Sequence, residues 1–285
     1  MLTQILSIAV DLTLITLTLA LAAFGLAIIY GLVGVINMGH GALLTLGAYL
    51  TWQATAWNVP FVFAVLFAAA GVCIIGLIFE HLVIRHFYDR PFDTLLLTWA
   101  FFLIVTELIK IVFGTDLRNV SNPLPGAFEV GGIHIPAYRA AVALFAVMLI
   151  AATAWLFYRT SLGIRIRALI QNREVAGLLG LNISLTYKIV FGMGAFMAGL
   201  AGGLVSPMLS IDPYIGNVYL VRSFFVVLVG GMGQLLSGTL IGSFFTGGSE
   251  TLFALFSSQA VAQTAVFALA ILILRFRPDG VLKSK

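Results

Sequence analysis

Residues 10–57 read VDLTLITLTLALAAFGLAIIYGLVGVINMGHGALLTLGAYLTWQATAW and are almost entirely apolar. A helix needs roughly 20 mainly apolar residues to cross the hydrocarbon of a bilayer. The stretch therefore predicts two spanning helices, at 10–35 and 38–57, with the glycines and the asparagine of 31–41 interrupting it. That interruption is either a loop or a break inside the membrane.

The composition of the whole chain agrees with this prediction. Of the 285 residues, 61% are hydrophobic and 9% are charged, whereas soluble domains carry about 25% charged residues. So few charges cannot cover a soluble surface, so the surface must face lipid. The 29 glycines allow helix backbones to approach one another closely in a membrane. The sequence thus predicts an all-α, polytopic transmembrane helical bundle.

Further apolar segments extend the count to about eight to nine helices in one transmembrane domain over residues 1–285. The N-terminus lacks the basic region of a signal peptide and its apolar stretch is too long for one, so it is read as the first spanning helix. The last segment is long enough for two helices broken near Ser257–Ser258. The remaining candidate spans are 60–82, 94–113, 138–158, 188–209, 218–233 and 238–274.

The basic residues predict how these helices are oriented. The segments 83–93, 159–188 and 275–285 hold 11 of the 15 Lys and Arg residues, and loops rich in Lys and Arg stay in the cytoplasm. We therefore expect these segments, and with them the C-terminus, on the cytoplasmic side. The loop 114–137 then faces outward, and its GAFEVGGIHIP stretch (126–136) is typical of a short hairpin or ordered loop. Because the basic residues serve orientation, the net charge of +4 predicts no nucleic-acid partner.

The sequence contains no recognisable catalytic, phosphate-binding or metal-binding motif. It contains no G-x-x-x-x-G-K-[ST] loop for phosphate, no H-E-x-x-H helix, no cluster of cysteines and histidines for a metal, and no G-x-S-x-G elbow. The single cysteine, Cys73, excludes a disulfide within the chain. The sequence therefore predicts a protein that is not an enzyme and that binds no metal or cofactor itself.

The segment 159–187 reads RTSLGIRIRALIQNREVAGLLGLNISLTY and is amphipathic from Ile164 to Leu181. Such a helix lies across a membrane surface or presses into a groove on a partner. A solvated connecting loop is the equal alternative.

Three motifs resemble those of a known family. Within REVAGLLGLNI (173–183), Glu174, Ala176 and Gly180 match the coupling-loop motif of ABC-importer permeases, with Val175 in place of its middle alanine. YGLVGVINMGHGALLTLGAYL (30–50) resembles the first signature of the branched-chain amino-acid permease family. FMAGLAGGL (196–204), followed by SFFVVLVGGMGQLLSGTLIG (223–242), resembles the second signature of that family. The similarity covers nearly the whole chain in order and includes the terminal RPDG (277–280).

The resemblance implies a permease subunit of an ABC importer in the bacterial plasma (inner) membrane, with branched-chain amino acids as the first expected substrates. It implies pairing with a homologous second permease, or with a copy of itself, and with two cytoplasmic ATPases that bind the ATP. A periplasmic binding protein would deliver the small-molecule substrate. The residues expected to meet the ATPase are Glu174, Ala176 and Gly180, surrounded by Arg165, Arg167 and Arg173.

Two Gly-punctuated segments contain candidates for the translocation path. Asn37 and His40 lie in the first, and polar side chains at membrane depth are costly unless they face a cavity or find a partner. Gly231, Gly233 and Gln234 lie in the second, and paired interrupted segments in a transporter point to unwound helices around a substrate path. Hydrogen bonding between helices, for the polar pair, and close helix packing, for the glycines, are the alternatives.

Arg222 and Glu250 are charged residues placed inside predicted helices. They pair with each other, or they meet the carboxylate and ammonium of an amino-acid substrate. Glu107 and Lys110, three residues apart on one helix, predict an intrahelical ion pair.

Two other functions stay open at this point. Urea or a short amide is an alternative substrate within the same family. A stand-alone, ion-coupled secondary transporter is the alternative from another class, in which the intramembrane charges would relay ions or protons.

Overall fold

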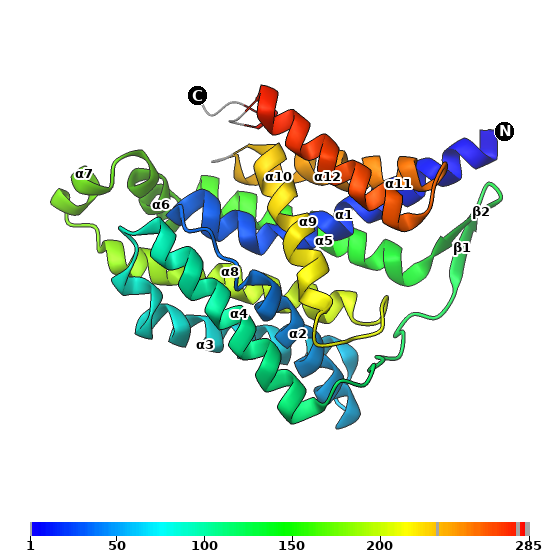
Figure 1. The fold of residues 1–285 in the computed structure, drawn as a ribbon, viewed down its shortest axis with the longest axis horizontal. Coiled ribbons are helices and arrows are strands. Elements are labelled where there is room, and N and C mark those ends of the chain that lie inside the picture. Colours follow the sequence, from blue (N-terminus) through cyan, green and yellow to red (C-terminus); the bar gives the residue numbers. More distant parts are fainter. Residues whose placement is uncertain (1, 232–233, 278–279, 283–285) are drawn as a thin grey trace.

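The computed structural model of the chain describes residues 2–231, 234–277 and 280–282. It is a helical bundle with one two-stranded antiparallel hairpin at its edge (Figure 1). The predicted fold class is therefore confirmed, as is the predicted hairpin. In chain order the elements are α1 (Leu2–Val33), α2 (His40–Ala56), α3 (Phe61–Leu82), the 3-10 helix η1 (Ile84–His86), α4 (Pro91–Phe113), β1 (Ala127–Val130), β2 (Ile133–Pro136), α5 (Ala137–Arg159), α6 (Ser161–Gln171), α7 (Arg173–Leu178), α8 (Ile183–Val205), α9 (Ile215–Gly230), α10 (Leu235–Ser243), the π-helix η2 (Phe244–Gly248), α11 (Ser249–Ala254) and α12 (Gln259–Phe276).

Each predicted span corresponds to a helix, but not every helix is a complete crossing. Within the described ranges, 6 helices are long and apolar enough to cross a membrane, namely α1, α3, α4, α5, α8 and α12. A seventh crossing forms if α9 and the helical segment Leu235–Ala254, whose axes differ in direction by 118°, count as one span. The predicted break near Ser257–Ser258 is present between α11 and α12. At 17 residues, α2 is shorter than the roughly 20 residues that a full crossing needs.

The short length of α2 follows from a break inside the bundle. Residues 34–39 are not helical, and the ring of His40, at the start of α2, lies 2.8 Å from the carbonyl oxygen of Ala22. Ala22 precedes the end of α1 by roughly 16 Å at the rise of a helix. The chain therefore leaves α1, runs back beside it as a non-helical segment that ends in a turn at residues 38–39, and begins α2 at the depth of the middle of α1. The interruption at 31–41 is a break within the bundle.

The centre of the bundle is α8, which packs against α1, α2 and α3. Small residues allow this contact: a β-carbon on Gly202 would lie 2.0 Å from the carbonyl oxygen of Leu44 on α2, and one on Gly47 would lie 2.4 Å from that of Gly199. The same holds between α9 and α10, where a β-carbon on Gly242 would lie 2.0 Å from the carbonyl oxygen of Val226. The close approach of helix backbones that the abundant glycines led us to expect is confirmed at these positions.

The outer helices present large apolar side chains to the surroundings. Examples are Phe67 on α3, Ile111 on α4, Leu144 on α5 and Leu272 on α12, each more than half exposed. A soluble protein rarely exposes apolar surface of this extent. These helices therefore form the lipid-facing surface of the bundle.

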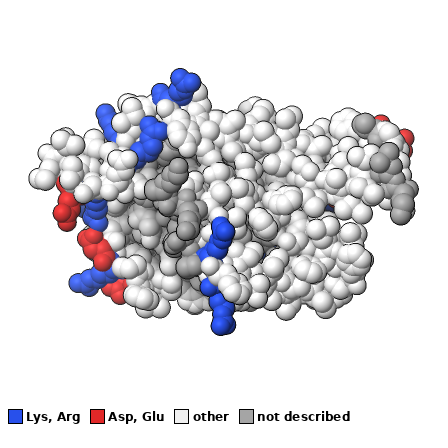
Figure 2. All heavy atoms as spheres, turned by 90° about the horizontal axis from the view of Figure 1, so that it is seen from above, with Lys and Arg blue, Asp and Glu red and all other residues white. Residues whose placement is uncertain are grey.

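The long axis of the molecule has two distinct ends (Figure 1). We call them the α7 end, which carries α6 and α7, and the hairpin end, which carries β1 and β2. Figure 2 shows one face of the molecule, seen from above the view of Figure 1. On this face the basic side chains lie between the α7 end and the middle of the molecule, and the half nearer the hairpin is almost free of them. An isolated bridge between Arg118 and Ile211 joins the loops after α4 and α8 away from the α7 end. The charge asymmetry expected of the sequence thus corresponds to a spatial one.

The crossing of α2 and α8 generates a first prediction. Replacing Gly202 by Val places side-chain atoms against the backbone of α2, and overpacking of this kind costs about 1–3 kcal/mol. We expect Gly202→Val to lower the melting temperature of the detergent-purified protein by several degrees. Gly31→Ala, where a β-carbon meets nothing within 4 Å, is the matched control and should leave the melting temperature unchanged or raise it. Equal melting temperatures for the two variants would contradict the packing described.

Candidate functional site

The amphipathic segment at the α7 end consists of two short helices. The hydroxyl of Thr160 accepts a hydrogen bond from the Gly163 N–H at the start of α6, and the side chain of Asn172 accepts one from the Val175 N–H at the start of α7. Side chains of this kind satisfy the free N–H groups of a helix N-terminus. Asn172 itself has an extended backbone, so the one amphipathic helix expected from Ile164 to Leu181 is broken there. This is a correction to the sequence prediction.

The end of α7 explains the spacing of the motif that the sequence matched. The Leu181 N–H donates to the Ala176 carbonyl at 3.1 Å, and the Gly180 N–H donates to the Gly177 carbonyl at 3.0 Å. This pair of bonds is a Schellman motif, which places the residue after the helix in the left-handed region. Gly180 adopts φ +82° there, and glycine does so without a steric penalty. Ala176 is buried beneath the helix, so small size and backbone freedom are what the motif positions require.

The outward face of α7 is apolar although it lies away from the bundle. Leu178 and Leu179 are 88% and 77% exposed, and Val175 lies on the same face. Glu174 is exposed in the first turn of this helix, and Arg165 is exposed on α6. Such a protruding face, apolar with charges beside it, is typical of a contact surface for another protein.

Arg173 ties this surface to the bundle. Its guanidinium forms an ion pair with Asp89 in the loop between α3 and α4, and stacks over the ring of Tyr187 on α8 at 5.4 Å. Tyr88 packs edge-on against Tyr187 and donates a hydrogen bond of 2.8 Å to Glu80 on α3. Burial and this hydrogen bond raise the pKa of Tyr88, so the phenol keeps its proton. These contacts connect the start of α7 to α3, to α8 and to the loop before α4.

The remaining predicted coupling residue, Arg167, behaves differently from Arg173. It stacks over the ring of Tyr158 on α5 at 5.4 Å and so fixes α6 against the preceding helix. Sequence reasoning missed Asp89 and Tyr88, because they lie in a short basic loop far from 159–187. The sequence feature that could have identified this site is Asp89, an acidic residue within a basic segment that also contains Arg85 and Arg90.

Asn37 and His40 are buried where α2 begins. The Asn37 side-chain oxygen accepts a hydrogen bond from the Gly39 N–H, and the His40 ring contacts the Ala22 carbonyl. One nitrogen of each side chain, Nδ2 of Asn37 and Nδ1 of His40, is buried without a hydrogen-bond partner among the described residues. These contacts hold the break in place, and a role in translocation stays a prediction.

The two Gly-rich interruptions lie next to each other in the fold. Gly31, near the end of α1, and Gly231 and Gln234, at the bend after α9, line one small pocket. Gly231 adopts φ +105°, a backbone conformation that ends α9 at Gly230. Gly233 lies outside the described residues. The structure therefore brings together Gly231 and Gln234 with the first interruption, whereas Asn37 and His40 lie deeper beside α1.

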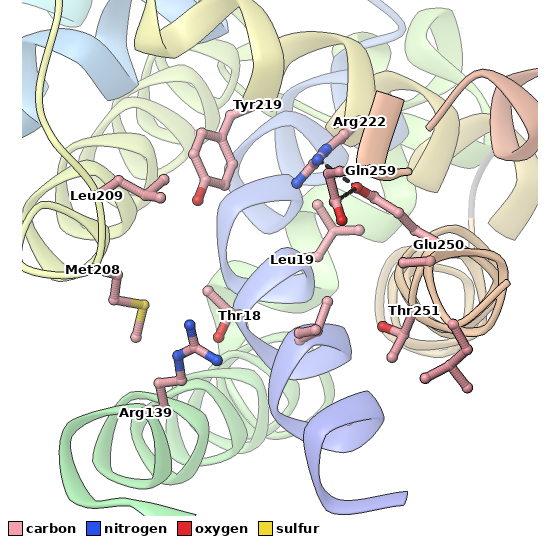
Figure 3. Close-up of a pocket in the computed structure, with 13 residues that line it drawn as sticks. Thr18, Leu19, Arg139, Met208, Leu209, Tyr219, Arg222, Glu250, Thr251 and Gln259 are labelled. Carbon is pink, nitrogen blue, oxygen red and sulfur yellow. Dashed lines mark hydrogen bonds and ion pairs between the residues drawn. The ribbon is translucent and has the colours of Figure 1, made fainter. Parts of the chain in front are cut away.

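A larger cavity, of about 440 Å³, lies between α1, α5, α9 and α11 (Figure 3). In its wall the Glu250 Oε1 atom accepts hydrogen bonds from Arg222 at 2.6 Å and from Gln259 at 2.7 Å. Arg222 and Glu250 thus pair with each other, and both also face the cavity. Arg139, on the first turn of α5, points into the same space from the opposite side in Figure 3. The other lining residues are Ile15, Thr18, Leu19, Met208, Leu209, Tyr219, Thr251, Ala254 and Leu255.

The π-helix η2 sets the position of Glu250. It directly precedes α11 and inserts a wider turn into the helix that carries this carboxylate. Single π-helical turns are rare and often lie at functional sites. Sequence reasoning missed Arg139 and Gln259 in this cavity. The available signal was that Arg139 is a basic residue outside the three basic segments.

The comparisons with known proteins point in one direction. The family model for the branched-chain amino acid transport system permease component matches residues 8–275. The high-affinity branched-chain amino acid transport system permease protein LivH of Escherichia coli K12 is 27% identical over 290 residues, covering 93% of this chain and 91% of the relative. The corresponding protein BraD of Pseudomonas aeruginosa is 25% identical over 284 residues, with the same coverage. A probable LivH of Methanocaldococcus jannaschii is 26% identical over 252 residues, covering 85% of this chain and 79% of the relative.

The Schellman motif generates a prediction about α7. Gly180→Ala forces a β-carbon into the left-handed region, at a cost of about 1–2 kcal/mol. We expect the amides of residues 176–181 to exchange hydrogen about tenfold faster, since about 1.4 kcal/mol is a factor of ten. Gly177→Ala is the control, because Gly177 has an ordinary helical φ and only the flexible end of Ile183 close by. Equal exchange in the two variants would refute the role given to Gly180.

The charged pair in the cavity generates another prediction. Glu250→Leu leaves the largely buried Arg222 without its carboxylate, and breaking a buried pair in this way costs up to about 3–5 kcal/mol. The double variant Arg222→Met/Glu250→Leu removes both charges and should melt near the wild-type temperature. Thermal melts of the single and double variants in detergent test this. A double variant that is less stable than Glu250→Leu alone would show that the two side chains do not act as a pair.

Proposed function

Because the chain belongs to the family of branched-chain amino acid transport system permease components, we propose that it is the membrane-spanning subunit of an ATP-driven importer of branched-chain amino acids in the bacterial plasma membrane. The chain forms the path through the bilayer in this importer. Energy and substrate capture come from partner subunits.

The observation that carries the proposal is the surface of α7. Leu178 and Leu179 project from the bundle with Glu174 beside them, and the sequence has no phosphate-binding loop of its own. A permease driven by ATP needs a surface by which a separate ATPase can push and pull its helices. The contacts of Arg173 with Asp89 and Tyr187 supply the mechanical link from that surface into the bundle.

The partners follow from this division of labour. Two ATPases bind ATP in the cytoplasm and contact α7, with Arg165, Arg167, Arg173, Ala176 and Gly180 shaping the contact. A second permease, homologous or a copy of this chain, completes the membrane part. A periplasmic binding protein delivers substrate at the hairpin end. The basic α7 end and the C-terminus are then cytoplasmic, in keeping with the rule for Lys and Arg.

The cavity charges favour an amino acid over the alternatives. Urea and short amides are neutral and offer no anionic group to Arg139 at the cavity wall. The ion-coupled carrier is also disfavoured. Within the described residues the buried carboxylates are Glu80 and Glu250, and each already accepts a hydrogen bond from a neighbour, so neither stands ready as part of an ion relay.

A co-purification experiment tests the proposal. The tagged wild-type chain, extracted from its host in mild detergent, should bring with it an ATPase containing a Walker motif. The variant Glu174→Lys/Gly180→Val reverses the exposed charge and distorts the end of α7, so we expect at least about a tenfold loss of the ATPase, as the removal of about 1.4 kcal/mol would give. Glu129→Lys, a charge reversal at the hairpin end, is the control and should retain the ATPase.

The same preparation separates the importer from the ion-coupled carrier. In liposomes the complex should take up leucine only with ATP. Uptake by the chain alone, driven by an ion gradient and indifferent to ATP, would contradict the proposed function.

A further inference from the structure

Four Lys or Arg residues lie outside the three basic segments 83–93, 159–188 and 275–285. The rule for Lys and Arg does not account for these four. Three of them have a carboxylate partner within 4.0 Å. Arg139 takes part in none of the ion pairs found among the described residues. The four are Lys110, Arg118, Arg139 and Arg222.

The position of Arg139 does not stabilise its own helix. It lies in the first turn of α5, where the positive end of the helix dipole disfavours a cation by about 0.3–1 kcal/mol. Its guanidinium points into the cavity of Figure 3 rather than toward a protein carboxylate. An unpaired arginine presents a fork of donors that fits a carboxylate in two parallel hydrogen bonds. The guanidinium of Arg139 is therefore suited to bind a ligand that carries an anionic group.

The opposite wall offers a site for a cation. Glu250 is buried, and its Oε1 atom already receives Arg222 and Gln259. No hydrogen bond to its Oε2 atom is found within the described part of the chain, and this atom is not among the buried unpartnered ones there. A carboxylate oxygen accepts more than one hydrogen bond. Glu250 can therefore receive an ammonium group while keeping its two protein partners.

Apolar side chains line the rest of the cavity wall. Ile15 and Leu19 come from α1, Met208 and Leu209 from the segment after α8, and Leu255 from the end of α11. Small-molecule pockets combine mainly apolar walls with a few polar groups that fix orientation, in volumes of about 300–1,000 Å³. The cavity, at about 440 Å³, has both features.

We propose that this cavity binds an α-amino acid as its zwitterion on the way through the permease. Arg139 receives the carboxylate, Glu250 receives the ammonium group, and an aliphatic side chain lies against Leu19 and Met208. The inference rests on the proposed function and adds to it the site and the orientation of the substrate. An anionic lipid headgroup would match Arg139 alone and leave Glu250 and the apolar wall unused, so the zwitterion accounts for more of the cavity.

The test uses the complete transporter, with its ATPases, second permease and binding protein, in liposomes. Leucine uptake and ATP hydrolysis stimulated by the loaded binding protein are measured for the wild type, Arg139→Gln, Arg139→Lys and Lys110→Gln. Lys110 is the matched control, because it is a cation near the end of α4, paired with Glu107 and outside the cavity lining. Hydrogen exchange of α5 verifies that each variant is folded.

We expect Arg139→Gln to lower leucine uptake per ATP hydrolysed about tenfold or more, the effect of one lost charge-assisted hydrogen bond. Arg139→Lys should recover part of it and Lys110→Gln should behave as the wild type. Saturation-transfer NMR on the complex without binding protein adds a direct readout. Leucine should give a stronger signal than 3-methylbutylamine or 4-methylpentanoate, each of which lacks one of its two charges, and Arg139→Gln should abolish the difference between leucine and 3-methylbutylamine.

Three results would overturn the site while leaving the proposed function in place. The first is wild-type uptake by Arg139→Gln. The second is a defect that disappears in liposomes without anionic lipid, which would assign Arg139 to a lipid headgroup. The third is loss of the stimulation of ATP hydrolysis together with uptake, which would assign it to docking of the binding protein. If the wild-type complex itself imports no leucine with ATP, the proposed function fails and the site fails with it.

Discussion

Lipid offers no hydrogen bonds to a peptide group, and this constraint acts most directly on the non-helical residues 34–39. A non-helical segment at membrane depth is tolerated only where protein surrounds it. Here the hydroxyl of Thr98 on α4 accepts from the Met38 N–H at 3.1 Å and lies 3.3 Å from the Ile36 carbonyl oxygen, and Asn37 serves the Gly39 N–H. Val35 within the segment is buried in a cluster with Ile29 on α1, Ile84 in η1 and Phe191 on α8. The peptide groups of this segment need hydrogen-bond partners, and this need constrains how α2 and α4 are placed around it.

The two functional regions lie at different places along α1. Its middle turns line the cavity that holds Arg222 and Glu250, while the region near its end, at Gly31, meets the bend after α9. Another cavity, between the end of α1 and the residues from Leu169 to Arg173, adjoins the segment that carries α7. In the proposed importer, the contacts of Arg173 with Asp89 and Tyr187 link a motion of α7 to the neighbouring helices.

Much of the fold was predictable because membrane helices are recognised by length and polarity alone. The break near Ser257–Ser258, the hairpin at 126–136 and the pairing of Glu107 with Lys110 all follow from local rules. The depth at which α2 begins was not predictable, since it depends on His40 meeting Ala22 from another helix. Nor was the break at Asn172, because amphipathic periodicity continues across it. Arg139 was missed for the same reason as Asp89: its meaning depends on which charges lie near it in space.

The most direct test of the account is site-directed crosslinking from the outward face of α7. Cys73 is the only cysteine, so Cys73→Ser gives a background in which Leu178→Cys carries a single thiol, with Leu117→Cys, also exposed, as the comparison outside the α7 surface. In membranes of the native host, treated with a short thiol–amine crosslinker, the account predicts that position 178 forms an adduct with an ATPase containing a Walker motif and that position 117 does not. An adduct at 117 but not at 178, or none with any nucleotide-binding protein, would contradict the claim that α7 receives the force of ATP hydrolysis.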